Sequence, residues 1–298
     1  MTLIDFQEKF ATNEQCRQFL YEKRWGNGFI CPKCAHDKHF NIKSRNLYQC
    51  KACNYQASVT AGTIMDKTRT PLKKWFLAIY LVAEDKRGVS ALTLQKRIGV
   101  AYFTAWTMLQ KIRYAMGQEE SNFLLGGIVE TDEAFFGAPT KEEEGGKRGR
   151  GTDKTPVIVS VSLTDDGKPR HVKMQVVEKI DGDSITAFAQ ANIHKGSEIR
   201  TDGLASYKPL AKVGYNLIQI IFNPKNQPEH LHWTHIVISN AKAFIEGTLH
   251  GLDTIHLQRY LDEFCYRFNR RWFESRLFLQ LVESSLSFGK IRNYELVG

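Results

Sequence analysis

GGIVETDEAFFG (residues 126–137) and SEIRTDGLASY (residues 197–207) are the two stretches that decide the fold. The first has the composition of a buried strand and carries Asp132 near its end. The second predicts a shorter strand that ends on Asp202, with Gly203 opening the next turn. Each of two strands therefore delivers one carboxylate close to its end.

Further strands and helices surround these two stretches. PVIVSVSL (156–163), RHVKMQVVE (170–178) and YNLIQIIF (215–222) predict three more strands, and DGDSITAFAQANI (181–193) predicts a helix. Everything after His232 has helical periodicity. The alternation of strands and helices predicts an α/β fold, in which helices flank a mixed sheet.

Asp132 and Asp202 suggest metal chemistry. Magnesium prefers oxygen ligands and keeps several waters, and a two-metal site in phosphodiester chemistry activates the attacking oxygen and stabilises the leaving one. A single Asp at a strand end is more often a turn residue. The pair therefore predicts a catalytic site only in combination with the motifs around it.

The N-terminal region holds two closely spaced cysteine pairs. Cys31 and Cys34 form one C-x2-C pair, and after fifteen intervening residues Cys50 and Cys53 form a second. Two-residue gaps let both sulfurs of a pair turn toward one ion, and four thiolates complete a tetrahedral site. The spacing predicts a zinc ribbon with a structural zinc. Because a site closed by four thiolates has no open position, catalysis at this metal is not expected.

The segment after the ribbon predicts a helix-turn-helix. Pro71 stands at the start of one helix, Ser90 is a candidate N-cap of the next, and Gly99 occupies a turn. The last helix would be the recognition element. The candidate DNA-binding residues on it are Tyr102, Thr104, Gln110 and Lys111. Any helical hairpin can produce this pattern. The basic zinc ribbon beside it is what favours a DNA-binding helix-turn-helix.

Composition and charge narrow the class of protein. The chain has 298 residues, with 41 Lys and Arg against 32 Asp and Glu, a formal charge of +9. Such an excess favours binding to polyanions, nucleic acid first and an anionic membrane surface second. No apolar stretch approaches the length of a membrane span, and the N-terminus lacks the order of a signal peptide. A cytoplasmic, nucleoid-associated protein is expected.

The motifs together resemble a known family. The order of zinc ribbon, helix-turn-helix, ETDEAFFG, RTDGLASY and HLQRYLDEFCYRFNRR resembles the DDE transposases of bacterial insertion sequences, within the zinc-ribbon subgroup that has an RNase-H-like (ISXO-like) catalytic domain. The resemblance implies that Asp132 and Asp202 bind magnesium or manganese. It also implies DNA cleavage at the inverted repeats, then attack of the freed 3′-hydroxyl on target DNA.

The third catalytic position departs from the usual family pattern. Many relatives have a Glu on a late helix, a Lys seven residues later, and then Gly-Thr. Alignment back from Gly247 and Thr248 makes the Lys Lys242 and puts His235 at the Glu position. A seven-residue step is two helical turns, so both side chains share one face. A neutral imidazole can bind a metal ion. Asn240 and Glu246 are the alternatives.

The resemblance also implies domains, partners and further contacts. We expect an N-terminal helix and zinc ribbon over 1–66, a helix-turn-helix over 67–120 and a catalytic domain over 121–298. Lys242 would contact a phosphate near the scissile bond, and Arg270 and Arg271 would grip the DNA backbone. The enzyme would act on two DNA ends as a homo-oligomer.

Three alternatives to an active transposase remain at this point. The missing third carboxylate favours an inactive DNA-binding derivative. A zinc-ribbon transcription factor leaves the strands and helices of the catalytic half unexplained. The third alternative is a nuclease of the same fold that does not transpose. The predicted DNA-reading helices argue against it.

Overall fold

The computed structural model describes residues 1–137, 154–221, 231–248 and 254–297. The chain forms two compact units, each described separately below. Met1–Gln118 and Phe273–Gly298 make up the N-terminal unit, and Glu119–Trp272 makes up the sheet unit. In the described parts of the chain, no helix is long and apolar enough to cross a membrane. The division differs from the predicted ranges, because residues 273–298 fold with the N-terminal unit instead of extending the catalytic domain from 121 to 298.

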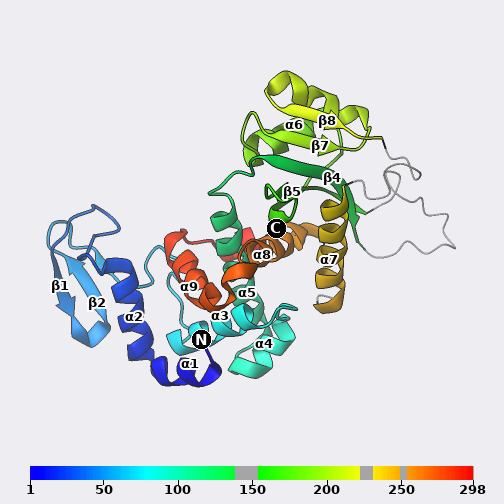
Figure 1. Ribbon diagram of the computed structural model, residues 1–298. Helices are drawn as coiled ribbons and strands as arrows, with labels where there is room; N and C mark the ends of the chain where they lie inside the picture. The colour runs from blue at the N-terminus through cyan, green and yellow to red at the C-terminus, as the bar shows by residue number, and fades with distance from the viewer. Residues whose placement is uncertain (138–153, 222–230, 249–253, 298) are drawn as a thin grey trace. The chain divides into compact units, whose positions relative to one another are not determined.

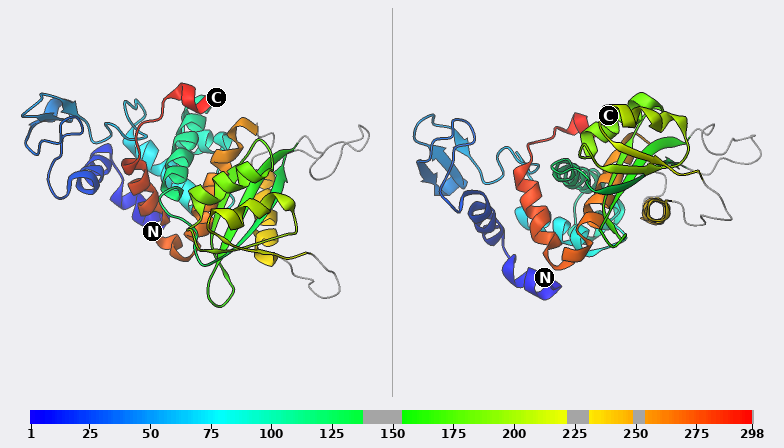
Figure 2. Two further views of the ribbon diagram at one scale, coloured as in Figure 1. Left: turned by 90° about the horizontal axis from the view of Figure 1, so that it is seen from above. Right: turned by 45° about the horizontal axis from the view of Figure 1, so that its top comes forward.

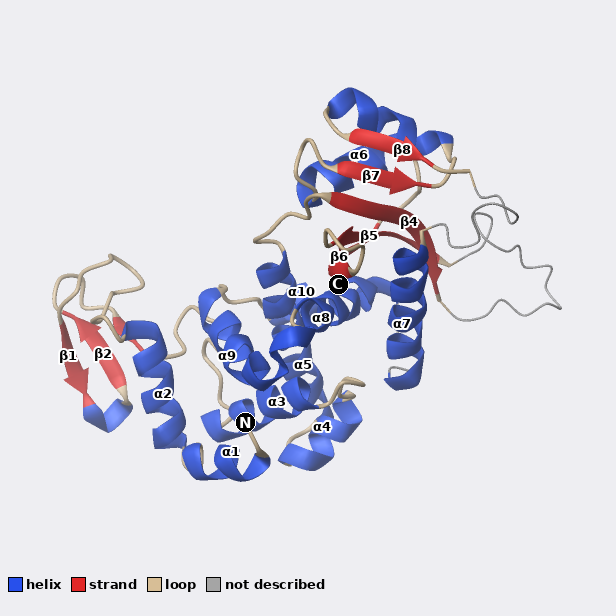
Figure 3. Cartoon of the chain, viewed as in Figure 1, coloured by secondary structure: helices blue, strands red, loops and turns tan. Residues whose placement is uncertain are grey.

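The sheet unit is built on a mixed five-stranded sheet (Figures 1 and 3). Its strands lie in the order β6-β5-β4-β7-β8. The first three strands in sequence pair antiparallel, and β7 and β8 continue the sheet in parallel on the other side of β4. This arrangement is RNase-H-like. Their bounds are β4 (Ile128–Phe136), β5 (Thr155–Leu163), β6 (Pro169–Val176), β7 (Glu198–Thr201) and β8 (Asn216–Gln219).

Helices cover both faces of this sheet, as the views in Figure 2 show. One apolar core lies between the sheet and α7 (His232–Thr248) and α8 (Leu257–Asn269). The other lies between the sheet and α6 (Gly182–Asn192) and the 3-10 helix η4 (Ala205–Val213). Residues of β4 alternate between these two cores, as expected for a strand buried on both faces. The short 3-10 helix η5 (Thr254–His256) precedes α8.

The N-terminal unit combines a small sheet with a helical core. The small sheet, β1 (His39–Ile42), β2 (Leu47–Cys50) and β3 (Gln56–Ala57), is antiparallel. α9, after the sheet unit in sequence, packs against α3 through Phe278, which contacts Phe76 and Phe10. The helices are α1 (Leu3–Lys9), α2 (Asn13–Trp25), α3 (Leu72–Glu84), α4 (Ala91–Ile98), α5 (Tyr102–Glu120, its last two residues in the sheet unit), α9 (Leu277–Ser287) and α10 (Asn293–Val297), with 3-10 helices η1 (Lys43–Arg45) and η6 (Arg271–Arg276).

The predicted helix boundaries of the helix-turn-helix are confirmed. Pro71 directly precedes α3, and the Ser90 side chain caps α4 by accepting from the Thr93 amide. Gly99 ends α4 with φ of 61°, the left-handed conformation that glycine adopts without strain. α5 begins three residues later.

Candidate active site and zinc ribbon

The two predicted aspartates lie side by side on paired strands. Asp202 directly follows β7, as predicted, but Asp132 is the fifth of the nine residues of β4, so the prediction that it stands near the end of its strand is wrong. β4 and β7 run parallel, with Ile128 opposite Glu198 and Glu130 opposite Arg200. Continuing that register by two residues brings Asp132 level with Asp202, which directly follows β7. Parallel pairing therefore brings together the two carboxylates that stand 70 residues apart in the sequence.

A third carboxylate joins this pair. Carboxylate oxygens of Asp132, Glu133 and Asp202 lie within 4.8 Å of one another. The burial of Asp132 and the nearby negative charge of Glu133 raise its pKa to about 6. A bound cation would remove this repulsion, because the carboxylates would then be ligands instead of competing charges. The oxygen donors present fit a hard divalent ion such as magnesium or manganese.

Glu133 and Asp202 are held by neutral polar groups. The buried Tyr207 hydroxyl donates to Glu133 Oε2 at 3.0 Å, and burial raises the pKa of Tyr207 well above its usual value, so this donor keeps its proton. Asp202 Oδ1 accepts from the Leu204 amide at 2.9 Å. The Gln219 side chain at the end of β8 donates to the carbonyls of Asp202 and Leu204. These contacts fix the turn that presents Asp202.

His235 faces the same site from α7. Its Nε2 lies 3.3 Å from Asp132 Oδ2, and its side chain is 58% exposed, against 17% for that of Asp132. An accessible imidazole beside a shielded carboxylate can bind a metal ion at the site entrance. Asn240 and Glu246 are exposed residues of the same helix. Asn240 is five positions beyond His235, about 1.4 helical turns, so it lies on another side of α7.

A residue that the sequence analysis missed positions α7. Glu130 is two residues before Asp132 on β4, so it points to the same face of the sheet. Its buried Oε2 accepts from the Thr234 amide at 3.0 Å and from the Thr234 hydroxyl at 3.2 Å. Thr234 is the third residue of α7, where backbone amides have no partner inside the helix. A carboxylate at this end also interacts favourably with the helix dipole. Glu130 thus places the next residue, His235, against Asp132.

Lys242 lies on the same side of α7 as His235, two turns later. Its Nζ is 5.8 Å from the centre of the Phe136 ring, at the last residue of β4. The ammonium group is therefore held near the strand that carries Asp132, while its side chain stays partly exposed.

The four paired cysteines converge as predicted. Their sulfurs lie within 4.8 Å of one another, with 3.7 Å between Cys31 and Cys53 and 3.6 Å between Cys34 and Cys50. In each knuckle a backbone amide donates to the first cysteine sulfur, from Lys33 to Cys31 and from Ala52 to Cys50. Such N–H···S bonds stabilise thiolates. The geometry and the four sulfur donors fit a structural zinc.

The predicted recognition residues on α5 divide into two groups. Tyr102 is 53% exposed, and Thr104 and Lys111 are partly exposed. Gln110 is fully buried, so its prediction as a DNA contact is corrected: a core side chain cannot reach a base edge. Apolar residues on both sides of Gln110 in the sequence, Met108, Leu109 and Ile112, are buried with it.

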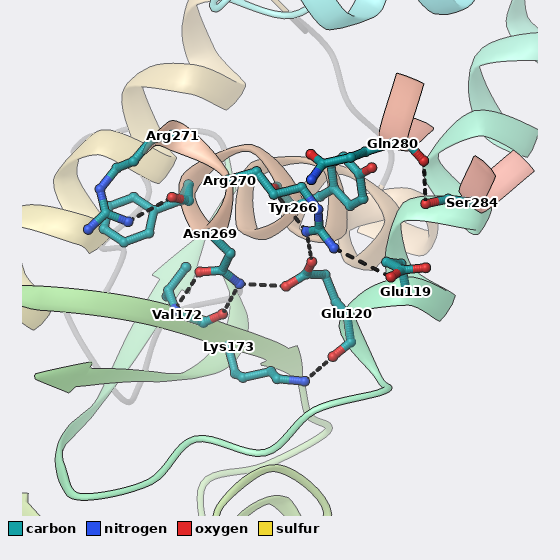
Figure 4. Close-up of polar contacts among 11 residues, drawn as sticks. Glu119, Glu120, Val172, Lys173, Tyr266, Asn269, Arg270, Arg271, Gln280 and Ser284 are labelled. Atoms are coloured by element: carbon teal, nitrogen blue, oxygen red, sulfur yellow. Dashed lines mark hydrogen bonds and ion pairs between the residues drawn. The ribbon is translucent and has the colours of Figure 1, made fainter. Parts of the chain in front are cut away.

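Arg270 and Arg271 make polar contacts with other residues of the sheet unit (Figure 4). Arg270 pairs with Glu120 and approaches Glu119 at 3.8 Å, while Asn269 bridges Glu120 and the Val172 backbone. Arg271 donates to the carbonyls of Phe268 and Arg170. Because the charge of Arg270 is already compensated by carboxylates, its predicted contact with DNA is corrected to a structural role. The guanidinium of Arg271 donates to backbone carbonyls, its charge has no carboxylate partner among the described residues, and its contact with DNA stays a prediction.

Comparisons with known proteins agree with this geometry. Residues 11–56 match the transposase zinc-ribbon domain family, and residues 124–269 match the ISXO2-like transposase domain family. The chain is 30% identical over 218 residues to an uncharacterized protein in transposable element ISH50 of Halobacterium salinarum, a match that covers 67% of this chain and 71% of that protein.

Among solved structures, the Mos1 mariner paired end complex with Mn matches weakly. The identity is 12% and the TM-score 0.29, over 72% of this chain and 79% of that chain. The two domain matches and the ISH50 relative show the family; in this chain the cysteine cluster lies within the first match and both aspartates lie within the second. The chain therefore belongs to the transposases that join a zinc-ribbon domain to an ISXO2-like transposase domain.

Proposed function

We propose that this transposase binds the terminal inverted repeats of an insertion sequence, cleaves the DNA there with a divalent metal, and joins the freed 3′ ends to target DNA. The observation that carries the proposal is the convergence of Asp132, Asp202 and His235 beside the end of β7. Two of these residues come from adjacent strands and one from a helix anchored to the same sheet.

Each residue has a defined part in the proposed reaction. Asp132 and Asp202 would hold magnesium or manganese, with His235 as the third ligand, and Glu133 lies close enough to supply another oxygen. When bound, the metal activates the attacking oxygen and stabilises the leaving oxygen. Lys242 would hold a phosphate beside the scissile bond. Tyr102, Thr104 and Lys111 would contact the repeat, and two copies of the chain would act on two ends.

An inactive DNA-binding derivative is the second candidate. The histidine at the third position favours it, since magnesium prefers oxygen to an imidazole ligand. The 3.3 Å approach of His235 to Asp132 opposes it, because the imidazole is close enough to bind the same metal ion as Asp132. Zinc in the ribbon would serve structure in either case.

Strand transfer tests the proposal directly. A duplex that ends in the terminal repeat with a free 3′-hydroxyl is incubated with the protein, a supercoiled plasmid and magnesium or manganese. The hydroxyl oxygen should bond to a plasmid phosphorus as the P–O3′ bond there breaks, giving a joined product. The same duplex with a 3′-dideoxy end should give none. Repeat binding without joining under either metal would support the inactive derivative.

A further inference from the structure

The N-terminal unit has a cavity of about 480 Å³ beside the predicted recognition helix. One wall is a single face of α5, where Phe103, Thr107 and Lys111 follow one another at helical spacing. The opposite walls come from the segment between the ribbon and α3, which includes Lys67, and from the segment before α10, which includes Lys290 and Arg292. Segments far apart in the sequence thus enclose one space.

The cavity is strongly basic. Lys67, Lys111, Lys290 and Arg292 line it, and Asp66 is the single carboxylate among its lining residues. Within the described ranges none of these four cations forms an ion pair. The guanidinium of Arg292 donates to the neutral Tyr294 hydroxyl, and its backbone amide donates to the Glu295 carboxylate. Partial burial lowers the pKa of Lys111, because desolvation disfavours its charged form. An anion in the cavity would compensate that charge.

A hydroxyl group in the cavity lacks a partner. Thr107 Oγ1 is shielded from solvent and makes no hydrogen bond to any described residue. A shielded polar atom without a partner costs free energy, and it indicates an acceptor or donor that enters from outside. The oxygens of a phosphate group accept hydrogen bonds from hydroxyl and ammonium groups alike.

An exposed aromatic ring, that of Phe103, lines the cavity on the α5 side. Phe103 is 58% exposed, and its ring stacks on that of Trp106 at 5.9 Å and 19°. Tyr102, next to it, is 53% exposed. Cations together with exposed aromatic rings suit a ligand that has both phosphates and flat apolar faces, as nucleic acid does.

We propose that this cavity binds backbone phosphates of DNA, so that Lys290 and Arg292 complete the DNA-binding surface of the N-terminal unit. The segment that carries them is anchored by the buried side chains of Ile291 and Leu296, so the two cations are presented from an ordered part of the chain. The inference rests on the proposed role of DNA as substrate. It is independent of whether the enzyme cleaves.

The test measures DNA affinity in a cleavage-deficient background, Asp132→Asn, at several salt concentrations. Lys290→Ala with Arg292→Ala should weaken duplex binding roughly tenfold and reduce the slope of log affinity against log salt by about 2, since each phosphate contact contributes about 0.9. Lys208→Ala with Lys212→Ala removes the same charge from exposed positions on η4, and it should change the slope less.

Four further outcomes are decisive. Thr107→Val keeps the side-chain shape and should weaken DNA binding with little change in the slope of log affinity against log salt. This result would distinguish the effect of the hydroxyl group from that of positive charge. Unchanged affinity and slope in the double variant, with unchanged unfolding temperature, would overturn the proposal. Tighter DNA binding would overturn it too and would mean that the segment covers α5. Competition by inorganic phosphate without any effect of the double variant on DNA binding would assign the cavity to a small anion.

Discussion

Replacing His235 with alanine should lower metal-dependent strand cleavage by a factor on the order of 10²–10³, because loss of a metal ligand removes several kcal/mol of transition-state stabilisation. DNA binding should survive, since His235 lies at the catalytic end of the sheet unit, far along the chain from the proposed DNA-reading helix α5. Cleavage and binding are measured on the same samples.

Two matched variants sharpen this prediction. His235→Glu restores the carboxylate common in relatives and should keep cleavage. Glu130→Gln leaves the imidazole in place but weakens the cap on α7. We expect it to cause an intermediate loss that a higher metal concentration recovers. Normal cleavage by His235→Ala would move the third position to Asn240 or Glu246.

Replacing Cys31 with serine should remove zinc from the ribbon and unfold the small sheet. A structural zinc contributes on the order of 10 kcal/mol to the folding of such a domain, far more than a three-stranded sheet of ten residues gains from its own contacts. Zinc content and hydrogen exchange over residues 29–57 measure both effects. The sheet unit has its own core and should keep its protection from exchange.

Cys265→Ala is the matched control for this experiment. Cys265 is buried in α8 and lies outside the cysteine cluster, so its replacement should leave the zinc content at one ion per chain. Full zinc content and unchanged exchange in Cys31→Ser would contradict a structural four-thiolate site.

Local sequence signals predicted the features that depend on local chemistry. The spacing of the four cysteines, the Ser90 cap and the Gly99 turn each follow from a few neighbouring residues, and the structure confirms them. Asp202 could be predicted as a strand end, because the apolar run stops beside it, whereas β4 continues four residues beyond Asp132. Their adjacency follows from the parallel pairing of β4 and β7, which the family resemblance implied but no local pattern specifies.

The features that could not be predicted from the sequence depend on contacts between residues far apart in the chain. In the sequence, Glu130 is simply a polar residue within a predicted strand. It caps α7 because the fold brings Thr234, 104 positions later, within hydrogen-bond distance of its carboxylate. Gln110 was predicted as a DNA contact from its place on the recognition helix, and Arg270 from its place in the basic C-terminal segment. Their burial depends on what packs around α5 and on Glu120 at the end of that helix. The fold of residues 273–298 onto the N-terminal unit is likewise set by tertiary contacts.

The most direct test of the catalytic site is strand cleavage of a labelled duplex that carries the terminal repeat, with magnesium or manganese. Wild type is run beside Asp132→Asn, and binding is measured on the same samples. The site described above predicts a nick at the repeat end in the wild type and none in the variant, with equal binding by both. Equal cleavage by the two proteins would contradict a metal site on Asp132, and binding without cleavage by the wild type would mean that the chain recognises DNA but does not cut it.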